Sequence, residues 1–180
     1  MAINKDRMLA VVAEYRSLRL EVIELRRAGH LSAAIERATH SVEFLEHHQE
    51  GLAYLIEAAH DLATLYGAVG DWASAELIFE KCRYVRDGVC GPRDKDTATA
   101  MMMLGVAKYF LHKYPEAEAL LATALAIREE VLGSSHADVA LALTNLAAVY
   151  RATERSAEAQ ELWDRAVRIG LPAGFQERPN

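Results

Sequence analysis

The feature that most constrains this chain is an internal repeat with a spacing of 42 residues. When the sequence is shifted by that amount, like residues coincide in three successive copies, and the columns alternate between large and small side chains. The clearest columns are Leu62, Leu104 and Leu146; Ala63, Gly105 and Ala147; Ala75, Ala117 and Ala159; Phe79, Leu121 and Trp163; and Cys82, Ala124 and Ala166. The connecting segments repeat as well, because Gly91 matches Gly133 and Asp96 matches Asp138. Such a chain is predicted to stack similar units, each of which contacts only its neighbours.

A fourth copy lies upstream at a spacing of 41 residues. Gly29 matches Gly70, but Glu21 falls where Leu62 stands in the next copy. Terminal repeats often depart from the pattern because one of their sides faces water.

Each unit is predicted to form two amphipathic helices joined by a short polar turn. In the last unit the apolar residues follow the rhythm of one helical face, as Val139, Leu143, Leu146, Ala147 and Tyr150 and then as Ala159, Leu162, Trp163, Ala166 and Val167. Gly70 is placed to end a helix in a left-handed conformation, and Asp96 and Asp138 are expected to act as N-caps of the helices that follow. The small columns let two helices approach closely, and the large residues fill the space between neighbouring helices.

The sequence therefore predicts an all-α fold, an alpha-alpha superhelix of about four helix-turn-helix repeats. We expect a single domain over residues 1–169 and a tail at 170–180. The repeats are expected at about 12–52, 54–95, 96–137 and 138–169.

Composition agrees with helices and argues against several classes of protein. Hydrophobic residues make up 52% of the chain while aromatic residues make up only 7%, and there are only four prolines. The net charge of -6 disfavours general nucleic-acid binding, which requires a basic surface to neutralise phosphates. No stretch approaches the roughly 20 apolar residues of a membrane span, and nothing resembles a signal peptide. We therefore expect a cytoplasmic protein without a nucleic-acid or membrane partner.

No catalytic constellation stands out. The sequence contains no phosphate loop, no dinucleotide fingerprint and no paired metal motif. The densest metal-like cluster is His47 and His48 with Glu46 and Glu50, and it is interpreted as a solvated helix end, because adjacent histidines on a helix point about 100° apart. Cys82 stands in an alanine column and is expected to be a packed small residue. We expect a protein that is not an enzyme and that holds no metal or cofactor.

The motifs resemble the tetratricopeptide repeat family, and within it the longer, 42-residue repeat of the kinesin light chain kind. The resemblance rests on Leu143-Thr-Asn-Leu146-Ala147-Ala-Val-Tyr150 and on Ala159-Gln-Glu-Leu-Trp163-Asp-Arg-Ala166, and it covers roughly residues 12–169. It implies an adaptor or scaffold that binds a protein or peptide in a concave groove lined by the first helices of all repeats. The chain departs from the pattern where Lys108 stands in the column of Tyr66 and Tyr150, and where His112 and Glu154 replace Gly70. Because of these departures, no particular partner is carried over.

Residues of the first helices that the core does not use are the candidate binding surface. The candidates are Arg16, Arg19, Arg26, His60, Asp61, Met102, Met103, Tyr109, Asn145 and Arg151. Residues 1–41 carry a net charge of +2 and residues 42–180 a net charge of -8, so the groove is expected to be basic at its beginning. The expected ligand is a short segment with carboxylates for the arginines and a large apolar residue for the methionine and tyrosine positions.

A second function stays open, that of a self-associating structural module in a larger assembly. The glycines and proline after residue 169 do not favour a further covering helix, so the helix that holds Leu162 and Trp163 is expected to be under-covered. Either Leu171 and Phe175 fold back over it, or a second copy covers it in a weak homodimer.

Overall fold

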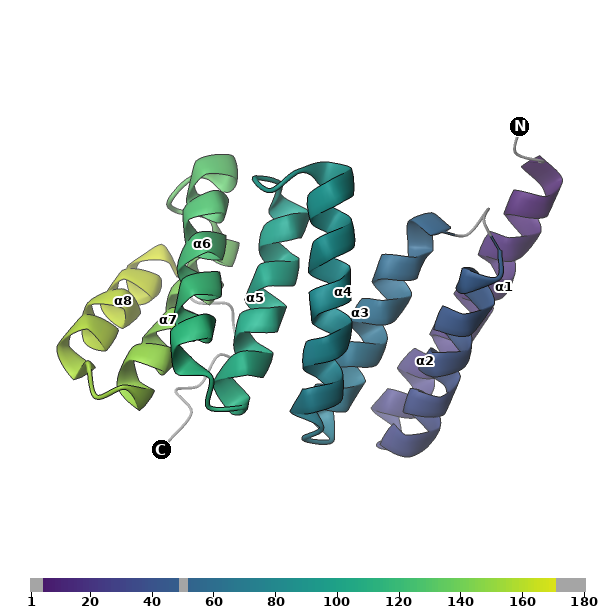
Figure 1. Ribbon diagram of the computed structural model, residues 1–180, viewed down its shortest axis with the longest axis horizontal. Helices are drawn as coiled ribbons and strands as arrows, with labels where there is room; N and C mark the ends of the chain where they lie inside the picture. The colour runs from purple at the N-terminus through teal and green to yellow at the C-terminus, as the bar shows by residue number, and fades with distance from the viewer. Residues whose placement is uncertain (1–4, 49–51, 171–180) are drawn as a thin grey trace. The chain divides into compact units, whose positions relative to one another are not determined.

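A computed structural model describes residues 5–48 and 52–170, and within these residues it contains eight α-helices and no strand. In chain order the helices are α1 (Lys5–Arg27), α2 (Leu31–Glu46), α3 (Leu52–Ala68), α4 (Trp72–Cys90), α5 (Lys95–Phe110), α6 (Tyr114–Leu132), α7 (Ala137–Ala152) and α8 (Ser156–Ile169), as Figure 1 shows. They form four successive pairs, so the predicted all-α fold of four helix-turn-helix repeats is confirmed. The chain divides into two compact units, residues 1–82 and 83–180, and the division falls within α4.

The turn inside each helix pair has the same backbone conformation in all four repeats. Its left-handed residue is Gly29, Gly70, His112 or Glu154, with φ values of 79°, 82°, 59° and 62°. The following amide donates to a carbonyl five residues back, as from Asp71 to Tyr66 at 2.9 Å. This bonding satisfies carbonyls that the helix end leaves open. The expectation for Gly70 is confirmed, and the two departures from glycine keep the same turn even though a left-handed residue with a side chain costs about 1–2 kcal/mol.

The predicted N-caps are wrong by two residues. Asp94 caps α5, because its carboxylate accepts a hydrogen bond from the Asp96 amide at 2.8 Å. His136 caps α7 in the same way, since its Nδ1 accepts from the Asp138 amide at 3.1 Å. Asp96 and Asp138 instead lie in the first turn, where a negative charge is favoured by the helix dipole.

The core of each unit lies between successive helices. In unit 2 it is formed mainly by α5, α6 and α7, and its fully buried members include Leu121, Val139, Leu143 and Val149. In unit 1, Leu62 and Leu65 of α3 pack with Ala34 and Ala38 of α2. A second cluster of unit 1 joins Val11, Tyr15, Leu45 and Ala58. The alanines of the small columns are buried, among them Ala63, Ala75, Ala117, Ala124, Ala147 and Ala166 at 0–5% exposure.

Gly105 shows why one small column admits nothing larger. A Cβ atom at this position would lie 2.8 Å from Cγ of Leu121, which is fully buried and cannot move aside. Gly88, which is also helical, has no atom within 4 Å of the corresponding position. The two glycines therefore offer a matched pair of substitutions.

We expect Gly105→Ala to lower the free energy of unfolding by about 1–3 kcal/mol, because it overpacks the contact between α5 and α6. Gly88→Ala should leave stability unchanged or raise it by up to about 1 kcal/mol, because alanine restricts the unfolded chain. Urea unfolding followed by circular dichroism measures both. Equal effects of the two substitutions would show that the 42-residue columns do not mark close helix contacts.

Candidate partner-binding surface

The candidate binding surface predicted from the sequence consists of the outward side chains of α1 and α3 in unit 1 and of α5 and α7 in unit 2. We call these two surfaces the first-helix face of unit 1 and the first-helix face of unit 2. Side chains 41 or 42 residues apart occupy equivalent positions on them.

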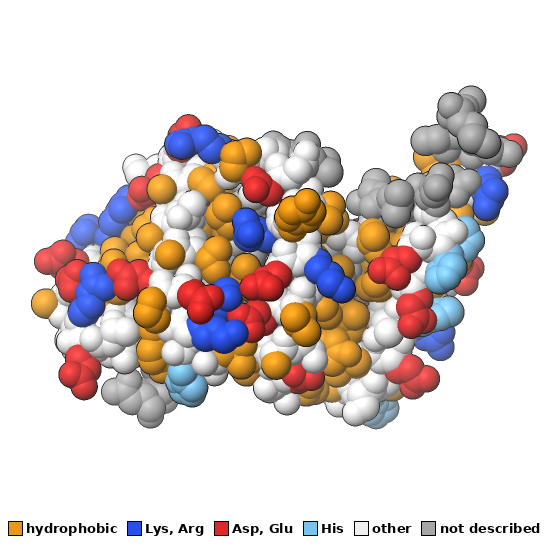
Figure 2. Space-filling view, in the orientation of Figure 1, with side chains coloured by type: hydrophobic (Ala, Val, Ile, Leu, Met, Phe, Trp, Pro, Cys, Tyr) orange, Lys and Arg blue, Asp and Glu red, His pale blue; other side chains and the backbone are white. Residues whose placement is uncertain are grey.

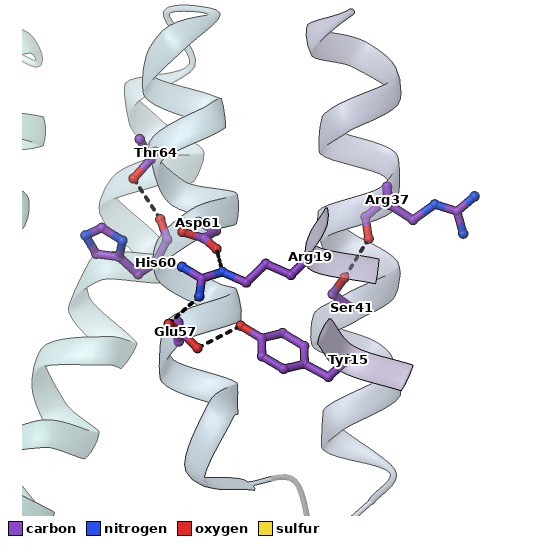
Figure 3. A network of polar contacts seen from close by, with 8 residues as sticks. All are labelled: Tyr15, Arg19, Arg37, Ser41, Glu57, His60, Asp61 and Thr64. Carbon is purple, nitrogen blue, oxygen red and sulfur yellow. Dashed lines mark hydrogen bonds and ion pairs between the residues drawn. The ribbon is translucent and has the colours of Figure 1, made fainter. Parts of the chain in front are cut away.

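An ionic cluster links α1 to α3 on the first-helix face of unit 1 (Figure 3). The Arg19 guanidinium donates from Nη1 to Oε1 of Glu57 at 2.5 Å and from Nε to Oδ2 of Asp61 at 2.8 Å. The Tyr15 hydroxyl donates to Oε2 of Glu57 at 3.1 Å, so both oxygens of that carboxylate are engaged. The charged side chains are 29–41% exposed, so water and salt reach the cluster. Arg19 and Asp61, which the sequence offers as candidates for the binding surface, therefore bind each other.

Tyr15 supports this cluster from the core. It is 1% exposed, and its ring lies 5.4 Å from the ring of Tyr54. Burial and the nearby Glu57 carboxylate raise the pKa of the Tyr15 hydroxyl well above its usual range. Tyr15 therefore remains a neutral donor at physiological pH. The stability that depends on its proton is present below the ordinary pKa of about 10 and is lost as the pH rises above it.

Two arginines without an ion pair and one leucine are exposed on α1. Arg16 and Arg26 are exposed, and neither forms an ion pair among the described residues. Leu20, which the sequence analysis missed, is 60% exposed. The 41-residue spacing contained the signal, because it places Leu20 in the column of Asp61, Met103 and Asn145.

His60 does not join these residues. In Figure 3 it points away from Arg19. Its ring meets the edge of the Phe79 ring of α4, with centroids 5.8 Å apart. The expectation that His60 lies beside Asp61 on the binding surface is therefore wrong, because adjacent helical residues point about 100° apart.

Met102 is also misplaced by the sequence analysis. It is 1% exposed and belongs to the core of unit 2, where its sulfur accepts a hydrogen bond from Arg128 at 3.2 Å. Its expected exposure is wrong, because its column turns toward the neighbouring helices, as the 4% exposure of Thr144 also shows. Met103 is only partly buried against the same core and keeps an accessible surface.

The rest of the first-helix face of unit 2 is half-buried. Tyr109 packs on the core and on the rings of Phe110 and Tyr114, at centroid distances of 5.2 and 5.9 Å. Asn145 and Arg151 of α7 are also partly exposed. Met103, Tyr109, Asn145 and Arg151 are thus partly exposed in unit 2, and Arg16, Leu20 and Arg26 are exposed in unit 1.

Beneath the face of unit 2 lies a buried cation. Arg128 is 3% exposed and donates to the backbone oxygen of Asp138 at 2.9 Å and to the hydroxyl of Thr99 at 3.1 Å. Burial lowers the pKa of its guanidinium from the ordinary value. Arg128 ties α6 to α5 and α7, so its position is set by packing.

In the described ranges, no three His, Cys, Asp or Glu side chains are arranged to hold a metal ion. Cys82 is buried, as its column predicts. None of the helices described is long and apolar enough to span a bilayer.

Comparison with known families decides which class these helix pairs belong to. The tetratricopeptide repeat profile matches residues 54–130 and 96–170, and together the two matches span more than half of the chain. The chain belongs to the tetratricopeptide repeat family. None of the curated protein sequences compared with it is significantly similar.

Several solved structures share the fold. BtubC from P. vanneervenii is 17% identical, with a TM-score of 0.73 over 98% of this chain and 78% of its own. A putative kinesin light chain from Podosopora anserina with nearly identical tetratricopeptide-like repeats is 22% identical, with a TM-score of 0.74 over 90% of this chain and 79% of its own. The apo form of RapI has a TM-score of 0.74 at 15% identity and covers 92% of this chain and 44% of its own. These likenesses confirm the alpha-alpha superhelix class and the resemblance to kinesin light chain repeats.

Tetratricopeptide repeat proteins generally mediate protein–protein interactions, and their fold is typically a scaffold without enzymatic activity. Membership of the family indicates this general role in protein interaction. The surface it would use has to be argued from its own residues.

The ionic cluster of unit 1 can be measured by a double-mutant cycle. Arg19→Met should lower the free energy of unfolding by about 0.5–1 kcal/mol, since both ion pairs are partly screened by water. Asp61→Asn should have a smaller effect in the Arg19→Met background than in the parent protein, because the partner is already absent. Arg16→Met is the control, because Arg16 lies on the same helix without an ion pair. Additive effects of the Arg19 and Asp61 substitutions would contradict the cluster.

Proposed function

We propose that this chain is an adaptor that binds a short segment of another protein through its first-helix faces. The observation that carries the proposal is the exposure of Leu20, at 60%, between the free cations Arg16 and Arg26. Leu20 lies on a first helix, the kind of element that the family resemblance assigns to the binding groove, and a partner seated there would cover it. We also propose that residues 1–169 form one repeat array and that the protein works in the cytoplasm.

The charges of the two faces suggest what the partner carries. Arg19 is neutralised by Glu57 and Asp61, which leaves Arg16 and Arg26 to attract carboxylates. On unit 2, the flexible side chain of Met103 and the aromatic ring of Tyr109 are suited to contact a large apolar residue of the partner. The proposed ligand therefore has acidic residues for unit 1 and an apolar anchor for either face.

A random peptide library displayed on phage tests this proposal without knowledge of the natural partner. Selection on the immobilised protein should enrich peptides that combine Asp or Glu with a large apolar residue. Leu20→Asp and Met103→Asp should each weaken binding of the selected peptides by about tenfold, the loss expected for an anchor worth about 1–2 kcal/mol. Arg16→Glu combined with Arg26→Glu should mainly slow association, and the effect should shrink as salt rises.

Two substitutions on second helices serve as controls. Val131→Asp places the same charge at a 47% exposed valine of α6, and Arg168→Glu reverses an exposed charge of α8. Neither should alter peptide binding by more than about twofold, because surface changes away from an interface are usually within about 0.5 kcal/mol. If the first-helix variants bind as well as these controls, the first-helix faces are not the site.

A specific observation also favours self-association through α8. Val167 is 52% exposed, whereas Leu125, one repeat earlier in the same column, is 8% exposed against α7. Leu162 and Trp163 are partly exposed on the same helix. Leu171 and Phe175, which the sequence analysis named as a possible cover, lie outside the described residues.

This second function predicts a weak homodimer. Sedimentation equilibrium at high micromolar concentration should give a mass above that of the monomer, and Val167→Glu should restore the monomer mass by placing a charge in the contact. Val131→Glu on α6 is the matched control. A monomer mass for the parent protein over the whole concentration range would exclude the dimer.

A further inference from the structure

A hollow lies between α1 and α2 of unit 1, in addition to the first-helix face. Its volume is about 940 Å³. One side is lined by α1 and the turn after it, including Glu21, Glu24 and Ala28, and the other by α2, including Ala33, Glu36 and Glu43. The longer stripe, from Ala33 to Glu43, spans eleven residues and about 15 Å along the helix axis, which is the length of two to three turns of an α-helix.

The repeat identifies this hollow as a place for packing a helix. In the next repeat, Leu62 and Leu65 of α3 are buried against α2, the second helix of the preceding pair. The positions 41 residues earlier are Glu21 and Glu24. The α1 stripe therefore has the geometry that receives a second helix, but carboxylates replace the leucines.

The charge in the hollow is largely uncompensated. Glu21 pairs with Arg37 at 2.9 Å. Glu24, Glu36 and Glu43 are exposed and form no ion pair among the described residues. Acidic side chains and histidines are seen to gather over α2 in Figure 2. Leu25, Ala28 and Ala33 supply the apolar part of the lining, which we call the floor of the hollow.

These features decide against a second copy as the occupant. Within unit 2, the helix that precedes a junction supplies acids and the pair that follows supplies bases, as in the pairs of Glu118 with Arg155 and Glu129 with Arg165. The matching stripe of α8 carries Gln160, Asp164 and Val167, so a copy docked by α8 would bring Asp164 toward carboxylates. The hollow requires the opposite charge.

We propose that the hollow between α1 and α2 is a docking site for a basic amphipathic helix of another protein, with arginines or lysines on both sides of a narrow apolar stripe. Its cations would pair with Glu24, Glu36 and Glu43, and its apolar stripe would cover Leu25 and the two alanines of the floor. The site is separate from the first-helix faces, so the chain can bind through two surfaces.

The probe is a synthetic 15-residue alanine-based helical peptide with arginines flanking a leucine stripe. A charge-reversed control peptide has glutamates in place of the arginines. Fluorescence anisotropy measures the binding of each to the full chain. The basic peptide should bind and the acidic one should not. Glu24→Gln with Glu36→Gln should weaken binding of the basic peptide about three- to tenfold, which is the effect of losing two partly exposed ion pairs.

Matched controls separate the hollow from the net charge of the protein. Glu14→Gln with Glu46→Gln removes two exposed carboxylates from the same helices outside the hollow and should change affinity less than twofold. Ala33→Trp fills the floor without changing charge and should weaken binding as much as the Glu24 and Glu36 pair. An equal loss in the Glu14 and Glu46 variant, or no loss with Ala33→Trp, would overturn the proposal. Met103→Asp should leave this peptide bound, so failure here is distinguishable from failure of the first-helix faces.

Discussion

Leu121 fills the space that a side chain at Gly105 would need, and this close contact of α5 with α6 is the kind of interaction on which the whole chain depends. A pair of helices of this length cannot bury its apolar stripe alone, so each pair must lie close to the next. Small residues in fixed columns make the approach possible, and large residues between them fill the volume. Side chains that this packing does not use stay exposed on first and second helices alike. The proposed binding surfaces on the first helices, on α8 and in the hollow come from that remainder.

Neighbouring first helices are tied together by different cations in the two units. In unit 1, Arg19 extends along the surface from α1 to the carboxylates of α3. In unit 2, Arg128 reaches from α6 beneath the surface and binds Thr99 and the backbone of Asp138. The first arrangement uses charged groups that water and salt can weaken, while the second is shielded by burial. The face of unit 1 is therefore more sensitive to ionic strength than the face of unit 2.

The columns of the sequence were sufficient to predict the helix pairs, the left-handed turn at Gly70 and the buried alanines. They were not sufficient to separate Met102 from Met103, because α5 is apolar on almost every side and its periodicity does not mark one face. The caps failed for a local reason, since Asp94 and His136 stand in a connecting segment where no periodicity applies. The contact of Arg19 with Asp61 could have been anticipated, because residues one repeat apart lie side by side on neighbouring first helices. A single sequence does not say whether such neighbours bind each other or a partner.

The replacement of leucines by Glu21 and Glu24 also limits how an array of this kind can lengthen during evolution. Duplication of an internal pair places apolar columns against apolar columns, so it preserves packing on both sides of the new pair. A pair inserted immediately before α1 would instead press its second helix onto two carboxylates, at the cost of burying charge. A repeat added ahead of α1 would therefore need cations on its second helix to face those two glutamates.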